Sequence, residues 1–306
     1  MKSSTKENIK FITLFILIIG ITAVIIGGSS IYTYLNGFNS KDNIVEPNEV
    51  KNDNSPVNIL LAGVDIGNGQ KNISYSRTDT LMLLNYNPKE EKLSIISIPR
   101  DTLIQINNKN DKINSASVYG GPKLTIAAVE YMLNIDVNYY AYVDYSGFRN
   151  IVDIIGGIDM EIKNNMDYDD TAQNLHIHFN KGESIHLDGK KAEEFFRWRK
   201  NNDGTGLAMG DLDRIANQHE FINKVIEKLK SPSMITKIPS VLSAMPKYIK
   251  TNMNGKAILK YGLLFSDSLK KGYTISTLKG DIEYLDGVSY FVYDEKQNKD
   301  LISKLN

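Results

Sequence analysis

The feature that most constrains this chain is an uncharged segment close to its N-terminus. No charged residue occurs over residues 11–35, and most of these side chains are apolar. A helix of about 20 apolar residues spans the hydrocarbon layer of a bilayer. Residues 1–10 carry three lysines against one glutamate, so the positive-inside rule keeps them in the cytoplasm and places the rest outside. We therefore expect a transmembrane helix over residues 11–35.

The alternative is a cleaved signal peptide, because Gly27, Gly28 and Ser29 resemble a small-residue cleavage site. Signal-peptide cores contain about 7–15 apolar residues, and this segment is longer, which favours a retained anchor. The expected protein is a single-pass protein of the cell membrane, with a cytoplasmic N-terminus and an extracellular domain.

Charge and composition exclude several classes of function. The 306 residues include 36 basic and 36 acidic side chains, so the strongly basic surface typical of nucleic-acid binding is not expected. The absence of cysteine excludes disulfides, thiolate metal sites and thiol nucleophiles.

Beyond a polar linker over residues 36–56, predicted strands alternate with amphipathic helices. The expected strands cover 57–64, 80–86, 92–98, 139–144, 159–162 and 273–278, and the expected helices cover 124–133, 145–155, 188–197, 211–230 and further stretches after 232. Such alternation is typical of a sheet covered by helices. We expect one extracellular α/β domain over residues 57–306, with a central mixed sheet flanked by helices. Its motifs fall within 58–230, and its C-terminal part is expected to pack on the same core.

Charged side chains follow or precede three of these strands. Asp65 ends the first, Arg77 and Asp79 precede the second, and Arg100 and Asp101 follow the third. Ligands of α/β folds bind at strand ends. Arg77 and Asp79 are two residues apart, so in extended chain they project to the same side. Surface ion pairs at loop ends are the alternative.

A second charged cluster lies further along the chain. Arg197 and Arg199 are close to the end of one predicted helix, and Asp211, Arg214 and Gln218 share one face of the next. The alternatives are an N-cap role for Asp211 and a solvated face for the other two.

Together, the two clusters have the chemistry of a pyrophosphate site. Arginine forks match phosphate oxygens, and Asp65 and Asp79 offer the oxygen ligands that Mg²⁺ prefers. An outward-facing, membrane-tethered pyrophosphate site favours a lipid-linked diphosphate as substrate. His176 and His178 also lie two residues apart, but with no third ligand in view we interpret them as a polar strand face rather than a metal site.

Seven segments in order resemble the LytR-CpsA-Psr domain family. They are NILLAGVD, SRTDT, LSIISIPRDT, DKINSASVYGG, VDYSGFRNIVDIIGGIDMEI, HLDGKKAEEFFRWRK and DLDRIANQ, which together extend over residues 58–218. The resemblance implies a Mg²⁺-dependent phosphotransferase of the cell wall. Such an enzyme moves a teichoic acid or capsule-like glycopolymer from a polyprenyl-pyrophosphate carrier to a peptidoglycan hydroxyl, and a phosphodiester link forms.

The resemblance also implies roles for individual residues. Asp65 and Asp79 would hold Mg²⁺, and the pyrophosphate-binding residues would be Arg77, Arg100, Lys112, Arg197, Arg199, Arg214 and Gln218. Lys112 rests on the resemblance alone. In the implied reaction Arg77 and Arg100 stabilise charge, and Asp101 or Asp211 accepts the proton of the hydroxyl.

Two positions depart from the family's pattern, at the rim of the expected pocket. Lys200 stands where a histidine is usual, in a loop that is longer than usual, and Asn217 stands where arginine is frequent. These differences concern the choice of acceptor or polymer more than the pyrophosphate site.

Two other functions remain open on sequence alone. A pyrophosphatase that releases the polymer to water would use the same pocket, and so would a non-catalytic protein that binds the lipid carrier. Transcriptional regulation is disfavoured, because no basic recognition helix is present and the part after residue 35 has 33 basic against 35 acidic side chains.

Overall fold

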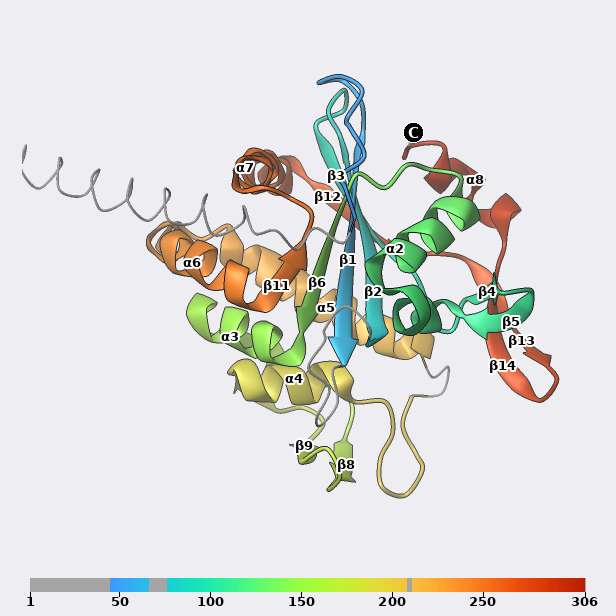
Figure 1. Ribbon diagram of the computed structural model, residues 1–306. Helices are drawn as coiled ribbons and strands as arrows, with labels where there is room; N and C mark the ends of the chain where they lie inside the picture. Colours follow the sequence, from blue (N-terminus) through green and yellow to red (C-terminus); the bar gives the residue numbers. More distant parts are fainter. Residues whose placement is uncertain (1–44, 66–75, 208–210, 306) are drawn as a thin grey trace, which may run out of the picture.

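The computed structural model describes residues 45–65, 76–207 and 211–305. Six strands of this part form the central sheet (Figure 1). In order across the sheet they are β11 (Ile249–Thr251), β6 (Tyr139–Asp144), β1 (Val57–Asp65), β2 (Arg77–Asn87), β3 (Lys92–Ser97) and β12 (Tyr273–Thr277). β1 and β6 are parallel, as are β3 and β12, and the other neighbours are antiparallel. The sheet is mixed, as predicted, and residues after 230 supply both edge strands.

Helices lie on both sides of this sheet (Figure 1). They are α2 (Ile113–Leu133), α3 (Tyr145–Ile155), α4 (Gly189–Arg197), α5 (Asp211–Leu229), the 3₁₀ helix η2 (Pro232–Lys237), α6 (Ile238–Tyr248), α7 (Gly255–Lys271) and α8 (Glu295–Ile302). α2 lies on one side, and α3, α6 and α7 lie on the other.

The residues of β1 explain why both faces need cover. Leu60 and Val64 belong to the buried cluster that contains residues of α2. Val57 and Ile59 belong to a separate buried cluster with Ile258 of α7. Successive side chains of a strand point to opposite faces, so an almost continuous apolar run requires helices on both.

α2 is longer than the sequence pattern predicts, since it begins at Ile113 rather than near residue 124. Gly121 breaks the helix with a φ of 61°, directly before Pro122, which lacks a backbone N–H. Only the turns after this break show the expected pattern. The turns before the break are therefore not predicted, since glycine followed by proline is typical of a helix boundary.

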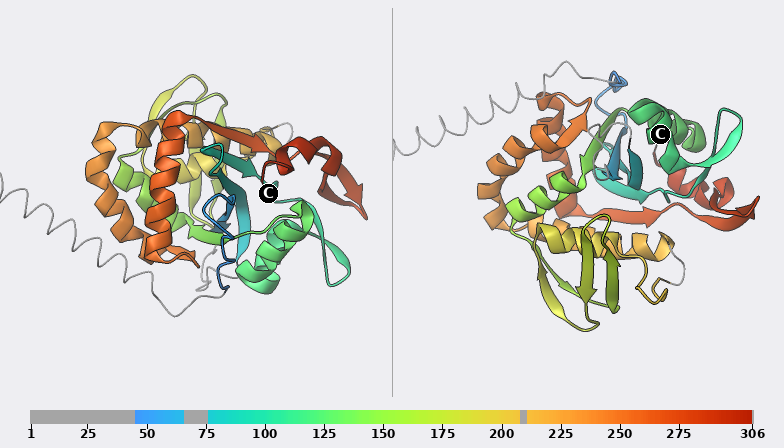
Figure 2. Two further views of the ribbon diagram at one scale, coloured as in Figure 1. Left: turned by 90° about the horizontal axis from the view of Figure 1, so that it is seen from above. Right: turned by 60° about the horizontal axis from the view of Figure 1, so that its bottom comes forward.

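Short two-stranded sheets extend from the core. They pair β4 (Leu103–Ile106) with β5 (Lys109–Lys112), β7 (Ile158–Glu161) with β10 (Ser184–Leu187), β8 (Met166–Asp170) with β9 (Leu175–Phe179), and β13 (Gly280–Leu285) with β14 (Val288–Tyr293). The β8–β9 hairpin and α4 lie beyond the end of the sheet where β1 ends (Figures 1 and 2). α4 and the hairpin therefore lie next to the strand ends at which Asp65, Asp79 and Arg100 are predicted to form a site.

Within the described ranges, no helix has both the length and the apolar character needed to cross a bilayer. The predicted cytoplasmic residues 1–10, the predicted anchor over residues 11–35 and the first part of the linker lie outside the described residues.

Candidate functional site

A bulge in β2 sets the position of Asp79. Gly63 pairs with Thr80 and Val64 pairs with Thr78, so Asp79 is an extra residue between two regular pairs. Bulges redirect a side chain and are frequent next to active sites. The bulge also interrupts the alternation on which the predicted common side of Arg77 and Asp79 depends.

Asp79 lines a polar pocket of about 120 Å³ beside the end of the sheet. The lining residues come from β2, the segment after β3, α3, the β8–β9 hairpin, α4 with the loop after it, and α5: Asp79, Arg100, Tyr145, Tyr168, Asp170, Gln173, Leu175, Arg197, Arg199, Lys200 and Arg214. Five of these side chains are basic and two are acidic. Such a concentration of positive charge favours an anionic ligand.

Arg100 and Asp79 form an ion pair in the pocket. Arg100 Nη1 donates to Asp79 Oδ1 at 2.5 Å, and the two side chains are 16% and 21% exposed. The pair unites two strand ends that the sequence analysis connected only through their charges.

Two side chains of α5 form hydrogen bonds with residues near the start of β2. Arg214 and Gln218 are 5% and 3% exposed, so the alternative of a solvated face is wrong for them. Arg214 Nη2 donates to the Asp79 backbone oxygen at 2.8 Å. Gln218 Nε2 donates to the Thr80 hydroxyl at 3.5 Å and to the Phe196 carbonyl at 3.4 Å. α5 thereby ties β2 to α4.

Arg197 of α4 is held by a partner in its own helix and by partners from the β8–β9 hairpin and α3. Its Nη1 donates to Glu193 Oε1 at 2.9 Å, one helical turn earlier, and the Glu193 side chain is 8% exposed. Its Nη2 donates to Gln173 Oε1, and its guanidinium lies 4.6 Å from the centre of the Tyr145 ring. Arg149 also contacts Glu193. These contacts fix the guanidinium plane, as bidentate recognition of phosphate requires.

Asn201 organises the loop that follows α4. The indole N–H of the buried Trp198 donates to Asn201 Oδ1 at 3.1 Å. The Asn201 side chain also accepts from the backbone N–H of Asp167 in β8 and donates to Thr205 across the loop. Arg199 and Lys200, between these anchors, are thereby held at the pocket.

The sequence and the fold of this chain have counterparts among known proteins. The sequence profile of the LytR_cpsA_psr family matches residues 28–306. The chain belongs to this family. The match confirms the resemblance drawn from the seven segments and extends it beyond residue 218 to the C-terminal part.

Similar LytR_cpsA_psr relatives have names that describe a transfer reaction. The polyisoprenyl-teichoic acid–peptidoglycan teichoic acid transferase TagU of Bacillus anthracis is 35% identical over 304 residues, which cover 94% of this chain and 95% of that protein. TagV of B. subtilis has a TM-score of 0.67 at 27% identity and covers 83% of this chain and 97% of its own. A structure of TagT bound to LI-WTA gives 0.65 at 28% identity, with 84% and 92% covered.

The two departures from the pattern of the LytR_cpsA_psr family have different surroundings. Lys200 lines the pocket, so a flexible ammonium stands where the pattern has an imidazole. Asn217 Nδ2 is buried and has no hydrogen-bond partner within the part of the chain that the structure describes. Of the two, Lys200 is therefore placed to contact a ligand.

Among the described residues, four predicted site residues do not line this pocket: Arg77, Asp101, Lys112 and the buried Gln218. Lys112 Nζ lies 3.0 Å from Asp101 Oδ1, so these two neutralise each other beside the β4–β5 sheet. Arg77 is the first residue of β2 and is exposed. In the register of the two strands it lies opposite Asp65, the last residue of β1. The side chains of Asp65 and Asp211 lie outside the described part of the structure.

Sequence reasoning missed several residues that line or support the pocket. Glu193 had a signal, because a carboxylate four residues before Arg197 in a helix forms an ion pair with it. Tyr145, Gln173 and Asp170 had none, since only the tertiary fold brings α3 and the hairpin to α4.

The loop after α4 supplies a prediction about stability. Gly206 has a φ of 148°, and a Cβ there would lie 2.6 Å from Lys200 Cα and 2.8 Å from the Arg199 carbonyl oxygen. Gly204 has a φ of 84°, and its Cβ would meet nothing within 4 Å. We expect Gly206→Ala to lower the free energy of unfolding by about 2–3 kcal/mol and Gly204→Ala to lower it by about 1 kcal/mol. Urea unfolding measures both changes. Equal losses of stability in the two variants would contradict the close approach of Gly206 to Arg199 and Lys200.

Proposed function

We propose that this chain transfers an anionic glycopolymer from a polyprenyl-pyrophosphate carrier to a peptidoglycan hydroxyl. The observation that carries the proposal is the pocket in which Asp79 lies among five basic side chains, in a family with relatives named as teichoic acid transferases. A pyrophosphate is negatively charged and would be attracted by the five basic side chains of this pocket. The predicted membrane anchor would hold the pocket close to a lipid-linked donor.

We further propose that the reaction requires Mg²⁺, and the residues at the strand ends fit this ion. Asp79 presents a carboxylate within the basic pocket, and Asp65 ends the neighbouring strand. Mg²⁺ usually takes one or two carboxylates together with oxygens of a substrate phosphate. When bound, it supplies positive charge that polarises the phosphoryl oxygens.

The proposed reaction is a displacement at the phosphorus that carries the sugar. The acceptor oxygen forms a bond to that phosphorus, the bond to the bridging oxygen breaks, and polyprenyl phosphate leaves. Arg100, Arg197 and Arg214 would hold the phosphate oxygens and stabilise their charge, because positioned cations supply most of the catalysis in such transfers. Tyr145 and Gln173 keep Arg197 in position.

The acceptor proton needs a base within reach of the pocket. Asp101 is paired with Lys112 and does not line the pocket, whereas Asp211 begins α5, the helix that presents Arg214. We therefore favour Asp211 over Asp101 as the proton acceptor.

Product analysis tests the proposal. The full chain is incubated with Mg²⁺, a polyprenyl-pyrophosphate-linked sugar and an uncrosslinked wall glycan, and the products are identified by mass spectrometry. We expect a sugar–phosphate–glycan adduct together with polyprenyl phosphate. Sugar phosphate released to water without an adduct would replace the proposal by a pyrophosphatase. Donor binding without turnover would replace it by a carrier-binding protein.

A further inference from the structure

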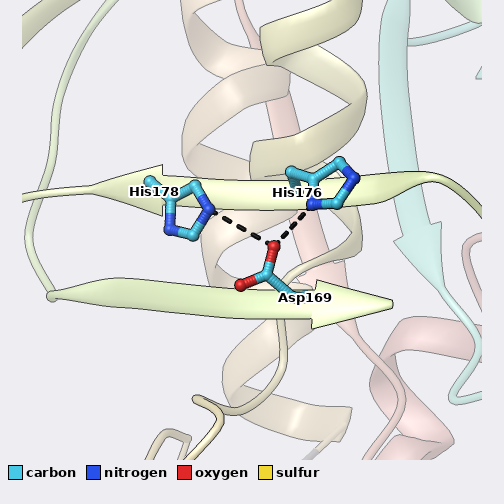
Figure 3. Close-up of side chains that lie close together, drawn as sticks. All are labelled: Asp169, His176 and His178. Carbon is cyan, nitrogen blue, oxygen red and sulfur yellow. Dashed lines mark hydrogen bonds and ion pairs between the residues drawn. The ribbon is translucent and has the colours of Figure 1, made fainter. Parts of the chain in front are cut away.

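The β8–β9 hairpin carries a compact cluster on its exposed face. His176 and His178 point outward from β9, and Asp169 of β8 lies between them (Figure 3). Asp169 Oδ1 lies 2.5 Å from His176 Nδ1 and 3.4 Å from His178 Nε2. This third group is not apparent from the sequence, because Asp169 belongs to the neighbouring strand.

We propose that Asp169, His176 and His178 bind a divalent transition-metal ion, for which Zn²⁺ is the probe. One ligand atom from each residue lies within 4.8 Å of the other two. Tetrahedral zinc with ligand bonds of about 2.0–2.2 Å needs ligand atoms roughly 3.4 Å apart. His178 already has this separation from Asp169, and His176 needs to move away from it by less than about 1 Å. The ion would take the place of the present hydrogen bonds.

The donor set decides which ions fit. Two imidazole nitrogens suit zinc, copper and nickel, whereas magnesium and calcium prefer oxygen ligands. This site is therefore selective against the ion proposed for the pocket, and the two can be tested separately.

Hydrogen bonds from neighbouring side chains already orient the proposed ligands. His178 Nδ1 lies 2.8 Å from Asp167 Oδ1, which leaves Nε2 directed toward Asp169. A carboxylate that accepts from one ring nitrogen makes the other nitrogen a stronger metal ligand. Asn202 Nδ2 donates to Asp169 Oδ2 at 3.3 Å, leaving Oδ1 to the histidines. A carboxylate behind a histidine ligand is the usual support in zinc sites.

The proposed site lies on the opposite face of the hairpin from the pocket. Tyr168, Asp170 and Leu175 line the pocket, and they alternate along the two strands with Asp169 and His176. A bound ion would clamp β8 to β9 from outside. Through Asn202 it would also fix the loop that carries Lys200, so it would stabilise one wall of the pocket without entering it.

Zinc titration of the full chain, stripped of metal with a chelator, tests the proposal by calorimetry. We expect one Zn²⁺ to bind in the presence of excess Mg²⁺, with a rise in unfolding temperature. Replacing both histidines by glutamine (H176Q with H178Q) should abolish both effects. Asp167→Asn should weaken binding by about 10–100-fold, as loss of such support does elsewhere.

His186 provides the matched control. Its Nδ1 lies 2.6 Å from Asp159 Oδ1 on the β7–β10 sheet, so it forms the same exposed His–Asp pair in a different sheet. His186→Gln should leave zinc binding unchanged. All variants should unfold at the wild-type temperature in chelator, because the replaced side chains are exposed. No zinc binding to the wild type, equal binding to the double variant, or equal loss in His186→Gln would overturn the proposal.

Discussion

Asp79→Asn is expected to lower the rate of polymer transfer by about 10²–10³-fold, the usual cost of removing one charge-positioning group. The change keeps the size of the side chain but removes the charge that faces Arg100 at 2.5 Å. It also removes a proposed Mg²⁺ ligand, so more Mg²⁺ should be needed for the activity that remains. The measurement is the initial rate of adduct formation over a series of Mg²⁺ concentrations.

Asp170→Asn is the control for this change. Asp170 lines the same pocket from β8, but it is not proposed to bind the metal. We expect its rate to stay within about tenfold of the wild type, with the Mg²⁺ requirement unchanged. An Asp79→Asn protein that is folded and transfers polymer within tenfold of the wild-type rate would contradict the assigned role of Asp79.

Glu193→Gln is expected to lower the free energy of unfolding by about 3 kcal/mol. The Glu193 side chain is 8% exposed and contacts both Arg197 and Arg149. Removing one partner of a buried ion pair costs about 3–5 kcal/mol, because the remaining charge is left without compensation. The lower end applies here, since the Arg149 side chain is 43% exposed. Urea unfolding with linear extrapolation measures the change.

Glu227→Gln serves as the comparison, because Glu227 forms an exposed pair with Lys224 one turn away on α5. Exposed pairs of this kind contribute less than about 0.5 kcal/mol. If Glu193→Gln were as mild as Glu227→Gln, Arg197 would not depend on Glu193 for its position, and the account of that side of the pocket would be wrong.

The strand-end part of the site could be predicted from the sequence because its signal is local. Asp79 and Arg100 each lie next to an apolar run, so the end of a strand can be recognised from neighbouring residues. The helical part was also accessible, since Arg214 and Gln218 share a helix face. Their burial was not, because it depends on the packing of α5 against β2 and α4.

The pocket wall formed by the β8–β9 hairpin could not be predicted in the same way. β8 has the sequence MDYDD, in which only Met166 is buried. Its strand conformation follows from pairing with β9 rather than from its own apolar pattern, and no local signal connects Asp169 with His176. The bulge at Asp79 was equally hidden, because it is a matter of register between β1 and β2.

The most direct test of the central claim follows the phosphorus atom itself. A polyprenyl-pyrophosphate-linked donor labelled only in the phosphate next to the sugar is incubated with the full chain, Mg²⁺ and wall glycan. We predict that the label becomes attached to the glycan together with the sugar, while the released polyprenyl phosphate is unlabelled. Label that remains with the lipid, or that appears only as free sugar phosphate, would contradict phosphodiester transfer by this pocket.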